Sequence, residues 1–512
     1  MTRLVLSLLL TVSIIGTDLF AQVFPRVLPA RVEDAIRFGN TEPLGTARFM
    51  GTGGSMTSIG VDYTTLHTNP AGIGWNRYSS VQLTGGFVTA PTKATLLGNF
   101  GNQEISDSRP RPTIPSFGVI YTQPTQSVNW STFNIGVGMT RLADFNETIS
   151  YDGFSEGSII DAIVEDLNDD FEDPFRRDLI FDIDPTISSI PLPLDQDGRA
   201  ILNDGSYYSD FDLEENLGGK IRRTGTVERS GSLNEFAIGA GGNYKEKFLW
   251  GITLGIPFIN FAETKVYDEV DERGEITSFD DAGFDETLEM TGSGVNFKFG
   301  TIYLPSPKIR ISAAVHSPTF WTIDETYFTT LEYNYTIDGV AQGGTGLSLR
   351  SEAAINLQTP WKFLLGAGYL VGSKGFVSFD ADYSNYAGSS FSFADFSEAD
   401  EITNEDIDNT LGSSIGIRMG GEVNVKPFQV RAGVGYRTIP NLDIRNDEAG
   451  GTTSVSIGAG WSKGKIFVDA ALRADVYSGY YAPYKTFAFD SNVVTTDRTR
   501  MQALVTVGYR GF

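Results

Sequence analysis

The sequence predicts an all-β fold, a transmembrane antiparallel β-barrel of about fourteen strands with an N-terminal hatch, or plug, inside its lumen. Three observations predict it. Segment after segment alternates apolar and polar residues, short turns alternate with long polar loops, and the chain begins with an export signal. Together these features are typical of proteins of the bacterial cell outer membrane, where we expect this chain to reside.

The composition favours many strands and tight turns. The 512 residues include 57 glycines, 35 phenylalanines and 21 tyrosines, but no cysteine, which excludes disulfides and thiolate metal sites. The net charge of −25 disfavours binding to nucleic acid. A mean hydropathy of −0.12 is compatible with a membrane barrel, because lumen-facing polar residues offset the lipid-facing apolar ones in the average.

The first 21 residues have the pattern of a secretory signal peptide. Arg3 supplies the positive start, Leu4 to Gly16 form an apolar run, and Ala21 offers a small residue at the cleavage point. The apolar run is shorter than the roughly 20 residues that a membrane-spanning helix needs. We therefore expect residues 1–21 to be removed on export.

The strands are predicted from alternation with a period of two. In residues 412–425, for example, Ile415 and Ile417 share one side, and Arg418 and Glu422 share the other. A soluble β-sandwich also alternates, but its connections show no systematic difference in length. The regular exchange of short turns and long loops favours a barrel.

The barrel is expected to occupy residues 78–512. The predicted strands lie near 78–90, 113–123, 130–143, 229–244, 247–267, 285–304, 308–327, 346–370, 374–391, 411–425, 427–439, 452–463, 465–480 and 498–511. The long loops lie near 91–112, 144–228, 268–284, 328–345, 392–410, 440–451 and 481–497. An even number of strands places both termini and the short turns in the periplasm and the long loops outside. Pro360 should kink its strand, because proline lacks a ladder donor.

The loop at residues 144–228 carries much of the negative charge. It holds 22 acidic residues against 6 basic ones, so we expect a solvated, extracellular, anionic segment. Within it, residues 158–167 have apolar residues at helical spacing and predict a short amphipathic helix over the barrel mouth.

Residues 22–77 precede the first strand and lack a long alternating run. The glycines at positions 51, 53, 54 and 60 suggest short, tightly turned elements. A hatch inside the lumen is one economical place for about 55 exported residues. A free periplasmic arm is the alternative.

Motifs in this N-terminal part resemble the hatch of the FadL/TodX family of outer-membrane transporters, in the form found in Bacteroidetes. They are Ala35-Ile36-Arg37-Phe38, Gly45-Thr46-Ala47-Arg48-Phe49-Met50-Gly51 and Asn69-Pro70-Ala71-Gly72-Ile73-Gly74. The resemblance continues in Arg418-Met419-Gly420-Gly421-Glu422 and in residues 427–433. One departure is that Tyr509 lies on the opposite parity from the final Phe512, so the usual assembly signal is only partly matched.

The resemblance implies passive, ligand-gated uptake of a hydrophobic small molecule, such as a long-chain fatty acid or an aromatic hydrocarbon. Asn69, Pro70 and Ala71 would form the hatch segment whose shift opens the path; the alternative is that they only cap a short helix and turn. Phe24, near the start of the exported chain, would line the pocket from below, or it belongs to a frayed terminus.

Charged residues on predicted lumen-facing positions come from several strands. They are Arg310, Asp380, Asp382, Arg418, Glu422, Arg431, Asp469 and Arg473. One interpretation is a network that braces a wide barrel against its hatch. The other is that one arginine receives a ligand carboxylate through two hydrogen bonds.

No enzyme, cofactor or metal is predicted, because His67 and His316 have no nucleophile or metal partner at motif spacing. The expected partners are the hydrophobic solute and the lipids and lipopolysaccharide of the outer membrane, with the protein a monomer. The main alternative function is a non-transporting barrel whose extracellular loops dock a protein partner. An open porin is disfavoured by the predicted hatch.

Overall fold

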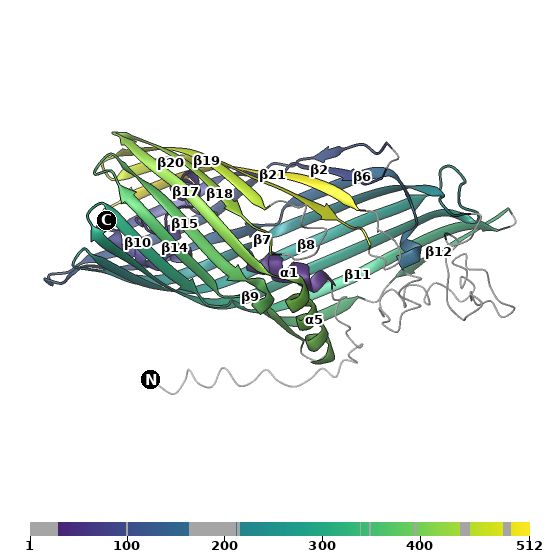
Figure 1. Cartoon of the computed structure of the whole chain (residues 1–512), viewed down its shortest axis with the longest axis horizontal. Helices are drawn as coiled ribbons and strands as arrows, with labels where there is room; N and C mark the ends of the chain where they lie inside the picture. Colours follow the sequence, from purple (N-terminus) through teal and green to yellow (C-terminus); the bar gives the residue numbers. More distant parts are fainter. Residues whose placement is uncertain are drawn as a thin grey trace, which may run out of the picture.

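The computed structural model describes residues 29–98, 101–162, 211, 216–337, 339–347, 350–393, 397–440, 451–484 and 493–511. Over this part the chain forms a closed antiparallel β-barrel with fourteen strand positions, as predicted (Figure 1). The first strand pairs with the last, Ser80 opposite Arg510, which closes the wall. The predicted signal peptide and Phe24 lie outside the described residues.

Eleven positions of the wall hold one continuous strand each. These are β1 (Ser80–Thr89), β4 (Arg111–Pro124), β5 (Trp130–Asp144), β7 (Lys220–Tyr244), β8 (Phe248–Val270), β9 (Phe279–Ser306), β17 (Ser413–Val425), β18 (Phe428–Arg437), β19 (Thr452–Lys463), β20 (Ile466–Tyr481) and β21 (Val494–Arg510). The other three positions hold two strands in line: β10 (Ile309–His316) with β11 (Phe320–Ile337), β14 (Lys362–Leu370) with β13 (Ser351–Gln358), and β15 (Gly375–Asn385) with β16 (Ser390–Phe393).

The predicted alternation sorts residues between the two faces of the wall. Ile415 and Ile417 on β17 are 49% and 43% exposed. Arg418, the next residue along the strand, is only 9% exposed and faces the lumen. Such exposed apolar side chains recur on every side of the barrel and form the outward band expected of a wall in contact with lipid. Tyr509 belongs to this band, and Phe512 lies outside the described residues.

The wall is uneven in height. Strands β7, β8 and β9 have 25, 23 and 28 residues, but β18 and β19 have only 10 and 12. The long strands project well beyond the short side (Figure 1). They therefore enter segments that the sequence predicted as loops.

The predicted loop at residues 144–228 begins and ends in strand structure. Strand β6 (Glu147–Glu156) pairs with the first half of β7, and only the segment between them contains the predicted helix. Residues 159–162 are helical, and the remainder of that prediction lies outside the described residues. The smaller additions to the wall are β2 (Thr92–Leu96), β3 (Ile105–Asp107) and β12 (Val340–Leu347).

Three neighbouring wall positions are interrupted at the same level. The interruptions are residues 317–319, 359–361 and 386–389, the last including the 3-10 helix η5 (Tyr386–Gly388). Pro360, where the sequence predicted a kink or bulge within one strand, lies in the second interruption and separates β13 from β14. The backbone stays hydrogen-bonded there, since Thr359 N donates to Thr319 O at 3.1 Å and Ser317 N to Phe297 O at 2.9 Å.

The first described residues lie inside the barrel. This inner segment, residues 29–79, contains α1 (Pro29–Gly39), α2 (Ala47–Gly51), η1 (Tyr63–His67) and η2 (Pro70–Trp75). One further helix, α5 (Ser397–Thr410), covers the rim between β16 and β17 (Figure 1). Among the described residues, no helix is long and apolar enough to cross a membrane.

Candidate functional site

The short helices of the inner segment are capped by their own side chains. The Thr46 hydroxyl accepts from Phe49 N at 3.1 Å, and Asp62 accepts from Thr64 N at 2.9 Å. Asn69 Oδ1 accepts from Ala71 N at 3.1 Å, and Pro70 occupies the first helical position of η2, where its missing N–H costs nothing. The capping interpretation of Asn69, Pro70 and Ala71 is thus seen in the structure, and their role in gating stays a prediction.

Glycines of the wall form a flat seat for this segment. A Cβ added at Gly300 of β9 would lie 1.9 Å from Asn69 Oδ1, and one at Gly251 of β8 would lie 2.3 Å from the Pro70 carbonyl group. Asn69 Nδ2 also donates to Thr301 O at 3.2 Å. The tight fit means that no solute passes between η2 and these strands unless η2 moves.

Ion pairs attach α2 to the short side of the wall. Glu422 of β17 accepts from Arg48 Nε at 2.9 Å and from Arg431 Nε at 2.7 Å. Arg431 in turn donates to Asp469 of β20 at 2.6 Å. The charges alternate along this chain, so each guanidinium has a carboxylate partner.

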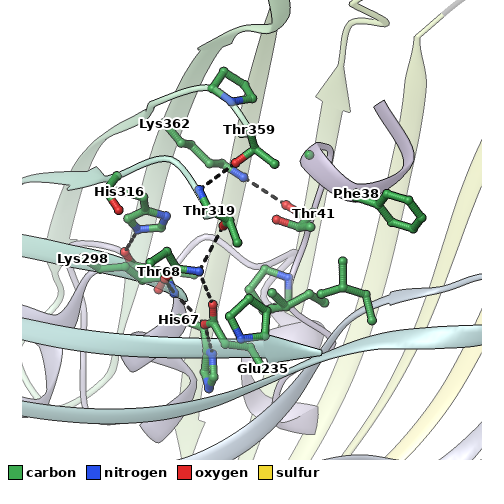
Figure 2. Close-up of a pocket in the computed structure, with 18 of the residues that line it drawn as sticks. Phe38, Thr41, His67, Thr68, Glu235, Lys298, His316, Thr319, Thr359 and Lys362 are labelled. Atoms are coloured by element: carbon green, nitrogen blue, oxygen red, sulfur yellow. Dashed lines mark hydrogen bonds and ion pairs between the residues drawn. The ribbon is translucent and has the colours of Figure 1, made fainter. Parts of the chain in front are cut away.

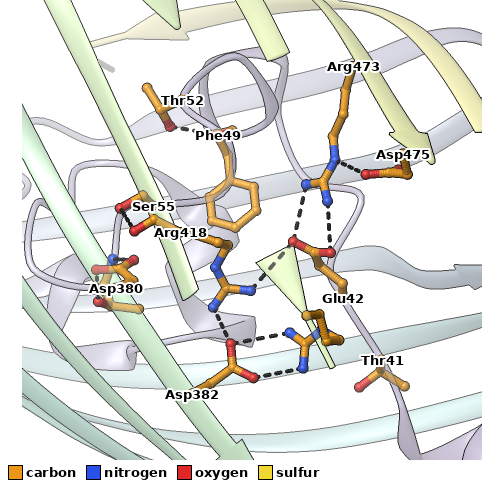
Figure 3. A network of polar contacts seen from close by, with 12 residues as sticks. Thr41, Glu42, Phe49, Thr52, Ser55, Asp380, Asp382, Arg418, Arg473 and Asp475 are labelled. Carbon is orange, nitrogen blue, oxygen red and sulfur yellow. Dashed lines mark hydrogen bonds and ion pairs between the residues drawn. The ribbon is translucent and has the colours of Figure 1, made fainter. Parts of the chain in front are cut away.

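Glu42 holds a second network together, in the turn before α2 (Figure 3). It accepts from Arg473 at 2.8 and 3.1 Å and from Arg418 at 3.4 Å. Burial raises the pKa of Glu42, but Arg473, Arg418 and Arg437 together lower that pKa to about 2. Glu42 is therefore ionised at neutral pH and ties the inner segment to strands β17 and β20.

Asp382 completes this network on the wall. It accepts from Arg418 at 2.7 Å and from Arg437 at 2.8 Å. Two further predicted lumen charges bind the inner-segment backbone: Asp380 accepts from Thr57 N at 3.0 Å, and Arg310 donates to Ile59 O. The structure thus brings seven of the eight predicted lumen charges against the inner segment or against a residue that binds it, and Asp469 joins them through Arg431.

Both histidines lie at the boundary between the inner segment and the wall, beside an enclosed cavity of about 60 Å³ (Figure 2). His67 Nδ1 lies 2.7 Å from Glu235 Oε1 of β7, and Lys298 of β9 donates to the same oxygen at 2.6 Å. Burial lowers the pKa of His67, although Glu235 acts in the opposite direction. His316 binds Thr68 O at 2.5 Å. The sequence pattern did not indicate Glu235 or Lys298.

Around α1, beyond these networks, more of the lumen is lined by apolar side chains. Helix α1 packs Phe38 against Phe261 and Phe145, with ring centroids 6.5 and 6.1 Å apart in edge-on geometry. Ion pairs are present here too: the buried guanidinium of Arg31 makes two hydrogen bonds of 2.7 and 2.9 Å to Glu325 of β11. These contacts hold α1 in an apolar chamber of the barrel.

A larger cavity, of about 450 Å³, lies between α1, the turn before α2 and the short side of the wall. One part of its lining is apolar, from Ile36, Leu44, Met50, Leu142 and Phe145. Another part is cationic, from Arg37, Arg229, Arg437, Arg473, Arg498 and Arg500, against the acids Glu33, Glu42, Asp144 and Asp475. The cavity is therefore amphipathic, with more positive than negative groups.

Arg500 differs from the other arginines of this cavity. Arg229 pairs with Glu263 at 2.5 Å, and Arg498 lies 2.9 Å from Glu147. The side chain of Arg500, on a lumen-facing position of β21, makes no hydrogen bond or ion pair with another described residue. Asp144, Glu147 and Asp475 act on it only through longer-range electrostatic interactions. It was not among the predicted lumen charges, although it faces the lumen as they do.

Comparison with known proteins gives a consistent fold. No family model matches the sequence, and no curated protein matches it either. Among solved structures, a Pseudomonas aeruginosa FadL homologue is 12% identical, with a TM-score of 0.55 over 92% of this chain and 99% of that one. The Pseudomonas putida toluene transporter TodX is 10% identical, with a TM-score of 0.52 over 91% and 98%. The chain therefore has the outer-membrane β-barrel fold of the FadL and TodX transporters.

Proposed function

We propose that this protein carries hydrophobic compounds passively inward across the outer membrane, and that its preferred ligands combine an apolar body with an acidic group. The observation behind the proposal is the amphipathic cavity with the unpartnered Arg500 in its wall. The fold shared with a FadL homologue and a toluene transporter supports the transport of apolar solutes. In this scheme the inner segment is the hatch.

Arg500 offers what the other cavity arginines lack. A guanidinium that is already paired must give up a carboxylate before it binds another, whereas a free one gains two charge-assisted hydrogen bonds. Such bonds contribute about 1.5–3 kcal/mol each to binding when the site excludes water. A long-chain fatty acid fits this arrangement, with its carboxylate on Arg500 and its tail along the apolar lining.

Passage beyond the cavity requires the hatch to move. The glycine seat and the ion pairs of Glu42 and Glu422 leave η2 and α2 in close contact with the wall. We propose that ligand in the cavity, next to Glu42 and Met50, shifts this segment together with Asn69, Pro70 and Ala71. A ligand that binds the open state of the hatch more tightly than the closed state supplies the free energy for opening.

The test compares an acid with its neutral ester. We expect Arg500→Gln to weaken binding of palmitate about 10-fold or more, by titration calorimetry in detergent, and to leave binding of methyl palmitate unchanged. Arg350→Gln, which alters an arginine that is 62% exposed, is the matched control. Equal losses for acid and ester would refute the role of Arg500, and absence of binding for both in the parent protein would refute the proposed function.

The alternative of a barrel that docks a protein partner depends on the loop at residues 144–228. Most of that loop, residues 163–210 and 212–215, lies outside the described residues. The docking function therefore stays a prediction.

A further inference from the structure

The short-turn end of the barrel carries a ring of exposed cations. Seven lysines come from five of the six short turns: Lys245, Lys247, Lys308, Lys374, Lys426, Lys463 and Lys465. The only acidic residue in these turns is Glu246, and Arg77 pairs with it at 2.8 Å. This lysine ring contrasts with the net charge of the chain, which is −25.

The cations at the two ends of the barrel differ in their partners. At the long-strand end, Lys93 pairs with Glu104 at 2.7 Å, and Arg109 pairs with Glu228 at 3.1 Å. In the lysine ring, no lysine makes an ion pair with another described residue. Positive charge that repels itself without internal compensation favours an external anionic partner.

The ring lies at the level of an aromatic belt. Tyr303 and Tyr369 face outward beside the short turns and are 51% and 48% exposed, and Phe428 is 56% exposed. Aromatic side chains at such positions mark the boundary between the hydrocarbon and the headgroups. Lys465 Nζ lies 5.6 Å from the ring centre of Tyr509, and Lys245 Nζ lies 5.2 Å from that of Tyr244, so these ammonium groups lie beside the aromatic side chains.

We propose that the lysine ring binds the headgroups of anionic phospholipids in the leaflet that surrounds the short turns. Short turns of bacterial barrels face the periplasm, where the outer membrane presents a phospholipid leaflet. Each lysine ammonium meets a phosphodiester at the depth where the aromatic belt ends. The ring continues the lipid-facing wall, and for this reason a lipid, rather than a protein, is its partner.

The experiment uses the full protein in phosphatidylcholine vesicles with a minor fraction of phosphatidylglycerol. Spin-labelled lipids report the relative association of each headgroup with the barrel. We expect a preference of about 5-fold or more for phosphatidylglycerol. Replacing the seven lysines of the ring by glutamine should reduce it to near unity, as should high salt.

The control variant replaces Lys93, Arg109, Arg222, Arg273 and Arg350, at the opposite end, by glutamine. It should keep the preference. Heat-modifiable mobility on gels shows whether each variant is a folded barrel. We expect both variants to fold, because the replaced side chains are exposed. A parent protein without headgroup preference overturns the proposal, and so does an equal loss in the control variant. An unchanged lipid preference in the lysine variant, with lost binding of an acidic polypeptide, would assign the ring to a protein partner instead.

Discussion

The two halves of the lumen are filled in different ways. The lower half is the part around α2 and η2, and the upper half is the part around α1. Around α2 and η2 the wall presents glycines and charged side chains, and each charge is matched by the inner segment or by its neighbour. Around α1 the wall presents mainly apolar and aromatic side chains, whose contacts have little directional preference, and one buried ion pair between Arg31 and Glu325 is added to them. The lower half is therefore fixed mainly by geometry and polar partners, and the upper half mainly by burial. A solute can replace an apolar helix more easily than it can replace a network of ion pairs.

The largest expected effect comes from the glycine seat. In Gly300→Leu the new side chain occupies the position of Asn69, so we expect either a loss of about 3 kcal/mol in stability or displacement of η2. Urea unfolding measures the first, and single-channel conductance in planar bilayers measures the second. The control is Gly388→Ala, where an added Cβ meets nothing within 4 Å. Unchanged stability and conductance would show that the seat is not tight.

The next effect tests the apolar half. Phe38→Ala removes the ring that packs on Phe145 and Phe261, and we expect α1 to lose about 3 kcal/mol of its docking free energy. Hydrogen exchange of residues 29–39 should accelerate by about two orders of magnitude, without a comparable change in α2. Glu33→Ala, at a side chain 67% exposed on the same helix, serves as the control. Parallel acceleration in α2 would mean that the two halves are coupled.

A smaller effect is expected from the ion pairs of the lower half. Glu42→Gln removes the shared partner of Arg473 and Arg418, and we expect a loss of about 2 kcal/mol, because the Glu42 side chain remains 29% exposed. Limited proteolysis within residues 39–46 reports the local release. If release occurs first in α1, the division of the lumen proposed above is wrong.

The smallest effect is a dependence on pH. The folded-state pKa of Glu42 is about 2, below its ordinary value of 4.5, so its contribution is complete above about pH 4.5 and is lost as the pH falls toward 2. Hydrogen exchange of the backbone amides in the turn before α2 should therefore accelerate as the pH falls through this range. The Glu42→Gln protein should lack this acid step. An equal step in that variant would assign it to another carboxylate.

The sequence was a good guide to the barrel and a poor one to the contacts inside it. Alternation with a period of two follows from the contrast between lipid and lumen, so Ile415 and Arg418 sort correctly without any knowledge of the fold. Beyond the membrane that contrast weakens, and for this reason β6 and the outer ends of β7, β8 and β9 were predicted as loops. Arg473 and Arg500 both face the lumen, yet only the former meets Glu42, since the path of the inner segment decides the pairing.

The three aligned interruptions in the wall have a consequence for how this protein can change in evolution. At this level the strand-to-strand pairing of β10, β14 and β15 ends and that of β11, β13 and β16 begins. The residues left between the two sets of pairs are 296–297 within β9, 317–319 between β10 and β11, 359–361 between β13 and β14, and 385–389 at the junction of β15 and β16. A one-residue insertion in an uninterrupted strand exchanges every later side chain between lipid and lumen. Here the break absorbs such a change, because an insertion within residues 317–319 leaves β10 and β11 each in its own register with the continuous strand β9. The rim beside α1 and α5 is therefore free to diversify while the hatch level keeps its contacts.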